Sequence, residues 1–157
     1  MNVIEAPNKL EFTNNSIFLA GTIDNGDSFD WQSEVIKSLN GFDITILNPR
    51  RKDWDSSWKQ TFDDPQFNEQ VNWELDALDK ADFILMYFAP ESKSPISLLE
   101  LGLYANSNKL IVCCPDGFYR KGNVEIVCKR YGISLFNSLE LMINLFMMYD
   151  AHYQKTI

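Results

Sequence analysis

The most informative segment of the chain is Ser94-Pro95-Ile96-Ser97-Leu98-Leu99-Glu100-Leu101-Gly102-Leu103-Tyr104-Ala105. Serine is favoured at the N-cap of a helix and proline at the first helical position, so we expect a helix from Pro95 to about Asn106. Glu100 is the only charged residue in this helix. Because no face of the helix is properly hydrophilic, the pattern predicts a helix packed inside the protein.

Glu100 is therefore expected to be a buried carboxylate. Burial of an unpaired carboxylate is costly, so such a group finds a partner, takes up a proton or is retained for chemistry. Position alone leaves two interpretations open, a structural carboxylate with a partner and a catalytic group.

Length and composition limit the classes of protein that need to be considered. The chain has 157 residues, of which 45% are hydrophobic, and we expect residues 1–157 to form a single domain. The net charge of -8 and the pI near 4.6 argue against binding to nucleic acid or to an anionic membrane. A small-molecule partner fits this composition better.

The three cysteines form no even framework, and two of them, Cys113 and Cys114, are adjacent inside an apolar run. Reduced thiols and a cytoplasmic location are expected from this usage. The sequence has no Cys-x-x-Cys and no spacing of histidine and cysteine typical of a metal site, so we expect no metal and no cofactor. It also has no segment as apolar as a membrane span and no leader-like start, which predicts a soluble protein.

Apolar runs alternate with amphipathic runs along the chain. Strands are expected at 16–20, 42–47, 81–88, 109–114 and 132–136, and helices at 29–39, 66–80, 95–106, 124–130 and 138–149. Residues 1–15 are expected to be irregular. Right-handed crossovers between such strands predict an α/β fold with one doubly wound, five-stranded parallel sheet in the flavodoxin-like order 2-1-3-4-5.

The carboxyl ends of parallel strands meet at one edge of the sheet, where open α/β sheets bind ligands. The loops 21–28, 48–54, 89–94 and 115–123 are therefore expected to surround one crevice. The helix of Glu100 begins there, and Glu100 lies roughly 9 Å along its axis at 1.5 Å per residue. Because helical side chains lean toward the N-terminus, Glu100 is expected to reach the floor of this crevice.

Several kinds of catalytic site have no support in the sequence. There is no phosphate-binding loop with Lys-Ser/Thr and no Gly-x-Gly-x-x-Gly motif, and the single histidine, His152, lies in the C-terminal tail. Carboxylates remain as the candidate catalysts. The cluster Arg50-Arg51-Lys52 after the second expected strand is either a solvated loop or a contact for an anionic ligand.

In several short segments the chain resembles a known family, the nucleoside 2-deoxyribosyltransferases, and especially their shorter branch of bacterial and phage proteins. The match spans about residues 16–136 and consists of Ile17-Phe18-Leu19-Ala20-Gly21, Asn48-Pro49-Arg50-Arg51, Trp73-Glu74, Ala81-Asp82 and the stretch from Ser94 to Ala105. Each piece is weak alone. The ordered set, ending in Glu-Leu-Gly on the helix after the third expected strand, is fairly specific.

The resemblance implies a nucleophile, an acid and a set of substrate contacts. Glu100 falls on the family's nucleophile, which attacks the anomeric carbon so that a second base or water takes over the sugar ester. Glu74 falls near the family's acid, although a solvated helix charge is the alternative interpretation. Substrate contacts are expected at Gly21, Asp24, Asn48, Arg50, Ser94, Ser97 and Asn123.

Asn123 is expected to act in a neighbouring subunit, since family members complete the site in this way. A homo-oligomer is also expected because the last helix carries a broad apolar face, made of Leu139, Met142, Leu145, Phe146 and Tyr149.

Two positions depart from the family pattern. Phe18 replaces a tyrosine that orients the nucleophile, so a hydrogen bond to Glu100 would have to come from Tyr104 or Ser97. Ser94 replaces an aspartate that binds the base, and Ser92, Ser94 and Ser97 could instead hold a phosphate.

The expected function is transfer of 2-deoxyribose from a deoxynucleoside to another free nucleobase. Hydrolysis of a deoxynucleoside 5'-monophosphate and non-catalytic nucleotide binding are the alternatives.

Overall fold

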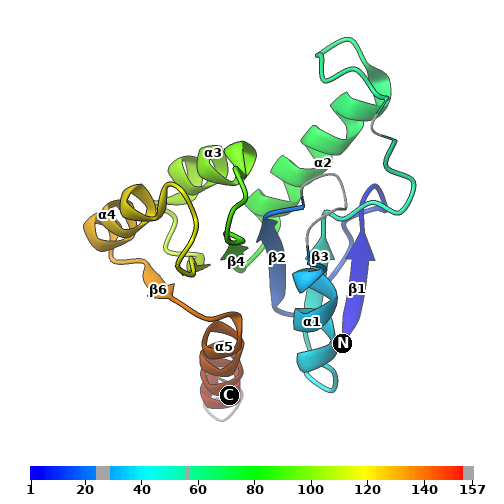
Figure 1. The fold of residues 1–157 in the computed structure, drawn as a ribbon. Helices are drawn as coiled ribbons and strands as arrows, with labels where there is room; N and C mark the ends of the chain where they lie inside the picture. The colour runs from blue at the N-terminus through cyan, green and yellow to red at the C-terminus, as the bar shows by residue number, and fades with distance from the viewer. Residues whose placement is uncertain (24–28, 56, 154–157) are drawn as a thin grey trace.

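A computed structural model describes residues 1–23, 29–55 and 57–153 of the chain. The described residues form one parallel sheet with helices between the strands (Figure 1). The strands are β1 (Asn2–Glu5), β2 (Ser16–Gly21), β3 (Thr45–Asn48), β4 (Phe83–Tyr87), β5 (Leu110–Cys113) and β6 (Ser134–Phe136). The helices are α1 (Trp31–Ser38), α2 (Pro65–Lys80), α3 (Pro95–Tyr104), α4 (Lys121–Tyr131) and α5 (Leu139–Tyr153).

The α/β fold with an all-parallel sheet is confirmed, but the expected five-stranded sheet in the order 2-1-3-4-5 is wrong. The described residues form six strands in the order β1-β3-β2-β4-β5-β6. The additional strand is β1, which lies at the edge and pairs in parallel with β3, Asn2 opposite Thr45 and Glu5 opposite Asn48. Its four residues include only two apolar ones, so no hydrophobic run marked it within the segment expected to be irregular.

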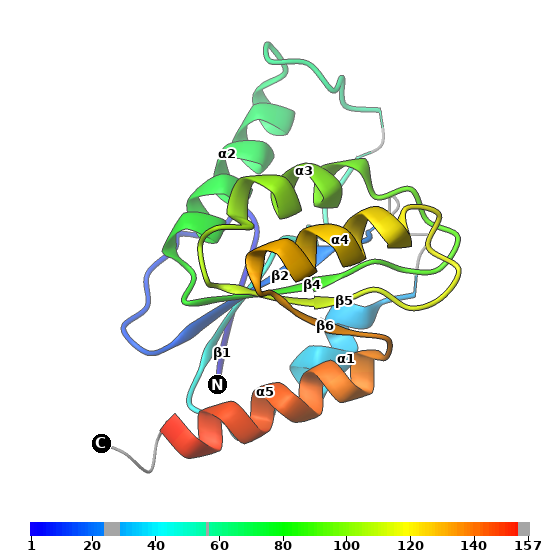
Figure 2. The same cartoon turned by 90° about the vertical axis from the view of Figure 1, so that its left-hand side faces the viewer.

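Helices cover both faces of the sheet. α2, α3 and α4 lie on one face and α1 and α5 on the other (Figure 2). Along β2, Phe18 and Ala20 pack with the core under α2, α3 and α4, whereas Ile17 and Leu19 pack with α1 and α5. This alternation gives two separate hydrophobic cores, one on each side of the sheet.

The helix of Glu100 is not buried all round, which corrects the expectation from its sequence. Its inner face packs on the sheet through Leu101, but Ile96, Leu99 and Leu103 are 58%, 59% and 58% exposed. These three residues are spaced like one helical stripe, which we call the α3 stripe. The apolar face expected on the last helix is instead covered by the sheet, since Met142 and Phe146 are buried there.

Gly21, at the carboxyl end of β2, lies where two strands approach closely. Its φ of 136° is one that residues with side chains rarely adopt. A Cβ atom at this position would lie 2.2 Å from the carbonyl oxygen of Tyr87 on β4. The glycine therefore permits the pairing of β2 and β4 at the edge where ligands bind in such sheets.

All three cysteines are buried and unpaired. Cys113 packs in the core under α1 and α5, whereas Cys114 and Cys128 pack in the core on the other face. Burial raises the pKa of the Cys113 thiol to about 12 and those of Cys114 and Cys128 to about 11. The thiols are therefore protonated at neutral pH.

Among the described residues, no helix is both long enough and apolar enough to span a bilayer.

Candidate active site

The loop between β4 and α3 is held by a cluster of buried hydroxyl groups. The Oγ1 atom of Thr22 lies 2.5 Å from Oγ of Ser94 and 3.1 Å from Oγ of Ser92, and the two serine oxygens lie 3.0 Å apart. Thr22 Oγ1 also accepts a hydrogen bond from the backbone N–H of Ala89. This hydroxyl cluster joins the end of β2 to the start of α3.

Ser94 occupies the N-cap position of α3, as expected, but its side chain makes no capping hydrogen bond. Its backbone is left-handed, with φ of 41°, and its hydroxyl is directed into the hydroxyl cluster. The hydroxyl groups of Ser92 and Ser94 are thus already engaged with one another and with Thr22.

Glu100 lies one and a half turns into α3 and is 7% exposed. Burial raises the pKa of its carboxyl to about 8, and the nearby negative charge of Glu74 adds to the shift. No described residue donates a hydrogen bond to this carboxylate. Tyr104, one of its expected donors, instead donates a hydrogen bond from its hydroxyl group to Oδ1 of Asp79 at 2.6 Å, and Ser97 is buried without such a bond.

Glu74 lies on α2, which packs beside α3 on the same face of the sheet (Figure 2). Burial raises the pKa of Glu74 to about 7, while a hydrogen bond from Gln70 acts in the opposite direction. The expected pair is therefore brought into electrostatic contact by two neighbouring helices, and Glu74 is not a solvated charge. Two carboxyl groups that repel each other in a low dielectric tend to share one proton near neutral pH.

Gln70 was missed by the sequence analysis. It lies one helical turn before Glu74, is 3% exposed, and its Nε2 atom donates to Oε1 of Glu74 at 2.8 Å. The same Nε2 atom donates to the carbonyl oxygen of Pro49 at 2.9 Å. The signal that could have found it is the i, i+4 spacing of an amide and an acid on one helix.

The basic cluster after β3 has acidic partners. Arg51 contacts Asp53 at 2.7 Å and Glu69 at 2.9 Å, and Lys52 contacts Glu5 at 2.8 Å. Arg50 lies near Asp30 and Gln32, at 3.7 and 3.5 Å. These contacts favour the interpretation of a surface loop for Arg51 and Lys52 over a phosphate site.

The remaining expected contacts are spread over the same edge of the sheet. Asn48 ends β3, is buried, and accepts a hydrogen bond from the Arg50 backbone, so it shapes the turn. Gly21 lies at this edge too, where the absence of a side chain permits the close approach of β2 and β4. Asn123 is exposed in the first turn of α4 and not in a loop, because α4 begins at Lys121. Asp24 falls outside the described residues.

A family profile described as "Nucleoside 2-deoxyribosyltransferase like" matches residues 14–118, about two thirds of the chain. The chain belongs to this nucleoside 2-deoxyribosyltransferase-like family. No curated protein matches the chain. Among solved structures, a conserved protein from Enterococcus faecalis V583 is 12% identical, with a TM-score of 0.49 over 85% of this chain and 88% of that one.

The segment that matches the nucleoside 2-deoxyribosyltransferase-like profile contains the buried Glu100 and the partly buried Glu74, together with Gln70. It also contains the hydroxyl cluster. Asn123 lies beyond its end. In the described part of the chain, no three His, Cys, Asp or Glu side chains are grouped to hold a metal ion.

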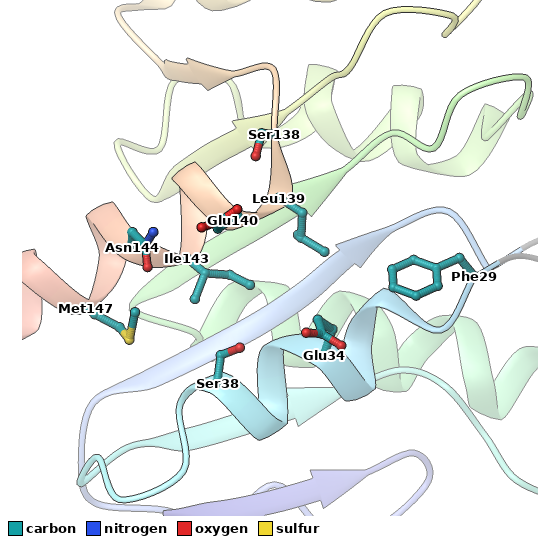
Figure 3. A pocket seen from close by; sticks show the side chains of 9 residues that line it. All are labelled: Phe29, Glu34, Ser38, Ser138, Leu139, Glu140, Ile143, Asn144 and Met147. Carbon is teal, nitrogen blue, oxygen red and sulfur yellow. The ribbon is translucent and has the colours of Figure 1, made fainter.

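A cavity of about 440 Å³ lies on the other face of the sheet, between α1 and α5 (Figure 3). Apolar side chains, among them Leu139, Ile143 and Met147, line it together with Glu34 and Glu140. It is separated from the carboxylate pair by the sheet (Figure 2). The cavity was not expected from the sequence and is not part of this site.

The raised pKa of Glu100 makes the stability of the protein depend on pH. An unfolded chain releases this proton near pH 4.5, whereas the folded protein holds it up to about pH 8, so stability falls as the pH rises through this window. We expect Glu100→Gln to remove this contribution. Relative to the wild type, the free energy of unfolding of Glu100→Gln should increase by on the order of a few kcal/mol between pH 5 and pH 8.5.

Urea unfolding at both pH values measures this gain. A difference between Glu100→Gln and wild type that stays constant with pH would contradict it.

Proposed function

We propose that the protein cleaves the N-glycosidic bond of a 2'-deoxynucleoside and transfers the sugar to another nucleobase. The observation that carries the proposal is the pair of a buried Glu100 and a partly buried Glu74 within the segment that matches the family profile. Carboxyl groups with raised pKa values are suited to acid catalysis near neutral pH.

In the free protein the single proton of the pair lies mainly on Glu100, whose pKa is the higher of the two. In this mechanism the substrate reacts with the minor form, in which that proton lies on Glu74 and Glu100 is ionised. A carboxylate oxygen of Glu100 attacks C1' of the deoxyribose as the C1'–N bond breaks, and Glu74 gives its proton to the departing base. The product is a glycosyl ester on Glu100. A second base attacks C1' of this ester, loses its proton to Glu74 and frees Glu100; water in its place gives free deoxyribose.

The deciding experiment incubates the protein with deoxyinosine, with and without adenine, and separates the products. Deoxyadenosine and hypoxanthine formed only when adenine is present indicate transfer. Free deoxyribose indicates hydrolysis. Binding of deoxyinosine with no product would contradict the proposal and support a non-catalytic nucleotide-binding module.

The substrate is expected to be the nucleoside and not its 5'-monophosphate. The hydroxyl groups of Ser92 and Ser94 are engaged in the hydroxyl cluster, and Arg51 is held by two carboxylates. A phosphate would have to displace these contacts. We therefore expect turnover of deoxyadenosine to equal or exceed that of deoxyadenosine monophosphate, as measured by kcat/KM with each substrate.

Arg50→Ala serves as the matched variant in this comparison, since Arg50 is the cation of the cluster next to Gln32 and Asp30. A tenfold or greater preference for the monophosphate that Arg50→Ala erases would overturn this choice, since a tenfold ratio corresponds to about 1.4 kcal/mol.

A homo-oligomer is proposed as the active form, with Asn123 reaching the site of a neighbouring subunit. The α3 stripe supports this, since Ile96, Leu99 and Leu103 form an exposed apolar surface on the helix of Glu100. We expect Leu99→Lys to lower the molar mass measured by light scattering at micromolar concentration. Leu141→Lys, on the exposed side of α5, is the matched control and should leave the mass unchanged.

A wild-type monomer under these conditions would contradict the oligomer and the role proposed for Asn123.

A further inference from the structure

Gln70 is held in one orientation by the backbone. The carbonyl oxygen of Pro49 can only accept a hydrogen bond, so the atom of Gln70 that lies 2.9 Å from it must be the NH₂ group. The same NH₂ group donates its other proton to Oε1 of Glu74 at 2.8 Å. Both protons of the Gln70 amide are therefore used.

The other end of this amide has no partner. Oε1 of Gln70 is buried and accepts no hydrogen bond from any described residue. An unsatisfied buried acceptor costs about 1–3 kcal/mol, which an apolar side chain of similar size would avoid. The two hydrogen bonds donated by the NH₂ group are therefore the interactions that favour glutamine at this position.

We propose that Gln70 is a positioning residue, whose bond to Oε1 of Glu74 places the acid proton of Glu74 on Oε2. This inference rests on the proposed function. In a protonated carboxyl group the carbonyl oxygen is a better hydrogen-bond acceptor than the hydroxyl oxygen. Because Oε1 accepts from Gln70, the proton is favoured on Oε2.

The turn after β3 fixes this arrangement before a substrate binds. Asn48 ends β3, and its side-chain oxygen accepts a hydrogen bond from the backbone N–H of Arg50 at 3.1 Å. This bond shapes the turn that presents the Pro49 carbonyl to Gln70. The Asn48-Pro49 pair thus contributes to the site through Gln70 and Glu74.

In the chemical step the proton on Oε2 of Glu74 moves to the nitrogen of the departing base. The C1'–N bond breaks and the bond between C1' and a Glu100 oxygen forms, so no charge is left on the base. When a second base or water attacks C1', its proton returns to Oε2. Gln70 stays bonded to Oε1 throughout, which keeps the acid in place for both halves of the reaction.

The first test follows the titration of Glu74 by NMR of carboxyl-labelled protein. Among the described residues, Glu100 on α3 is the charged side chain that interacts electrostatically with Glu74. Because the bond from Gln70 favours the ionised form of Glu74, we expect Gln70→Met to move the midpoint of Glu74 to higher pH by about half a unit or more. An unchanged midpoint overturns the inference, whatever the activity of the protein.

Asn72→Ala is the matched control, because Asn72 is also an amide on α2 that bonds one turn back, to Asn68, away from the carboxylates. It should leave the Glu74 midpoint unchanged. Gln70→Leu also removes both donors and adds no charge beside Glu74, and it replaces Gln70→Met if that variant does not fold.

The second test uses leaving groups. We expect Gln70→Met to lower kcat with deoxyinosine by about tenfold or more, within the range of acid catalysis, with little change in KM. With 4-nitrophenyl 2-deoxyriboside, whose leaving group needs no proton, kcat should change less than about threefold. Equal losses with both substrates would indicate a structural role and overturn the inference.

The outcomes separate the two proposals. If the wild type releases base normally and Gln70→Met does so equally well, the inference fails and the proposed function stands. If the wild type releases neither hypoxanthine nor 4-nitrophenolate, the proposed function fails and the role of the Oε2 proton fails with it.

Discussion

Replacement of Glu100 by glutamine is expected to abolish base release from a deoxynucleoside while the protein stays folded. The amide keeps the size of the side chain but is not a nucleophile, so no glycosyl ester can form. We expect kcat to fall by at least about a thousandfold, since loss of a nucleophile removes covalent catalysis altogether. Release of hypoxanthine from deoxyinosine, followed by chromatography, measures the effect.

The matched control is Glu140→Gln, which makes the same change on α5, on the opposite face of the sheet. It should keep the activity of the wild type. Far-UV circular dichroism of both variants checks that they are folded. Wild-type rates in a folded Glu100→Gln protein would end the proposal that Glu100 carries the reaction.

Gly21→Ala is expected to cause the largest loss of stability among single substitutions in the sheet. The new methyl group would meet the Tyr87 carbonyl oxygen at 2.2 Å, and the backbone φ of 136° is strained for alanine. Since the obstacle is backbone, β2 and β4 would have to separate. We expect a loss of about 3 kcal/mol or more in the free energy of unfolding, measured in urea.

Gly41→Ala separates the two causes of this loss. Gly41 also has a positive φ, 97°, but a Cβ atom there would meet no atom within 4 Å. It should lose only about 1 kcal/mol, from backbone strain alone. Equal losses in the two variants would show that the contact with Tyr87 does not decide the requirement for glycine.

Much of the fold could be predicted because its strands are continuous apolar runs. β4 and β5 are buried on both faces, and such strands stand out from the amphipathic helices between them. β1 could not be predicted, because only two of its four residues are apolar and no hydrophobic run marks it in the sequence. The exposure of the α3 stripe also escaped prediction, since an apolar helix surface does not reveal what covers it.

The site was predictable to the extent that local sequence determines it. A lone carboxylate in an apolar helix indicated Glu100, and the structure adds that Glu74 lies close enough to raise its pKa. The partner of Tyr104 could not be foreseen, because Asp79 lies on another helix. The contact between Thr22 and Ser94 depends likewise on how β2 and α3 meet in space.

The three buried cysteines make the chain suited to site-specific chemistry. Protonated thiols inside the two cores react slowly with maleimides and disulfide reagents, which need an exposed thiolate. A cysteine introduced on the surface would therefore be the one reactive handle on the folded protein. Placed at Leu141, which is exposed on α5 and lies outside the proposed interface, such a handle would carry a spin label or a crosslinker without removal of any native cysteine.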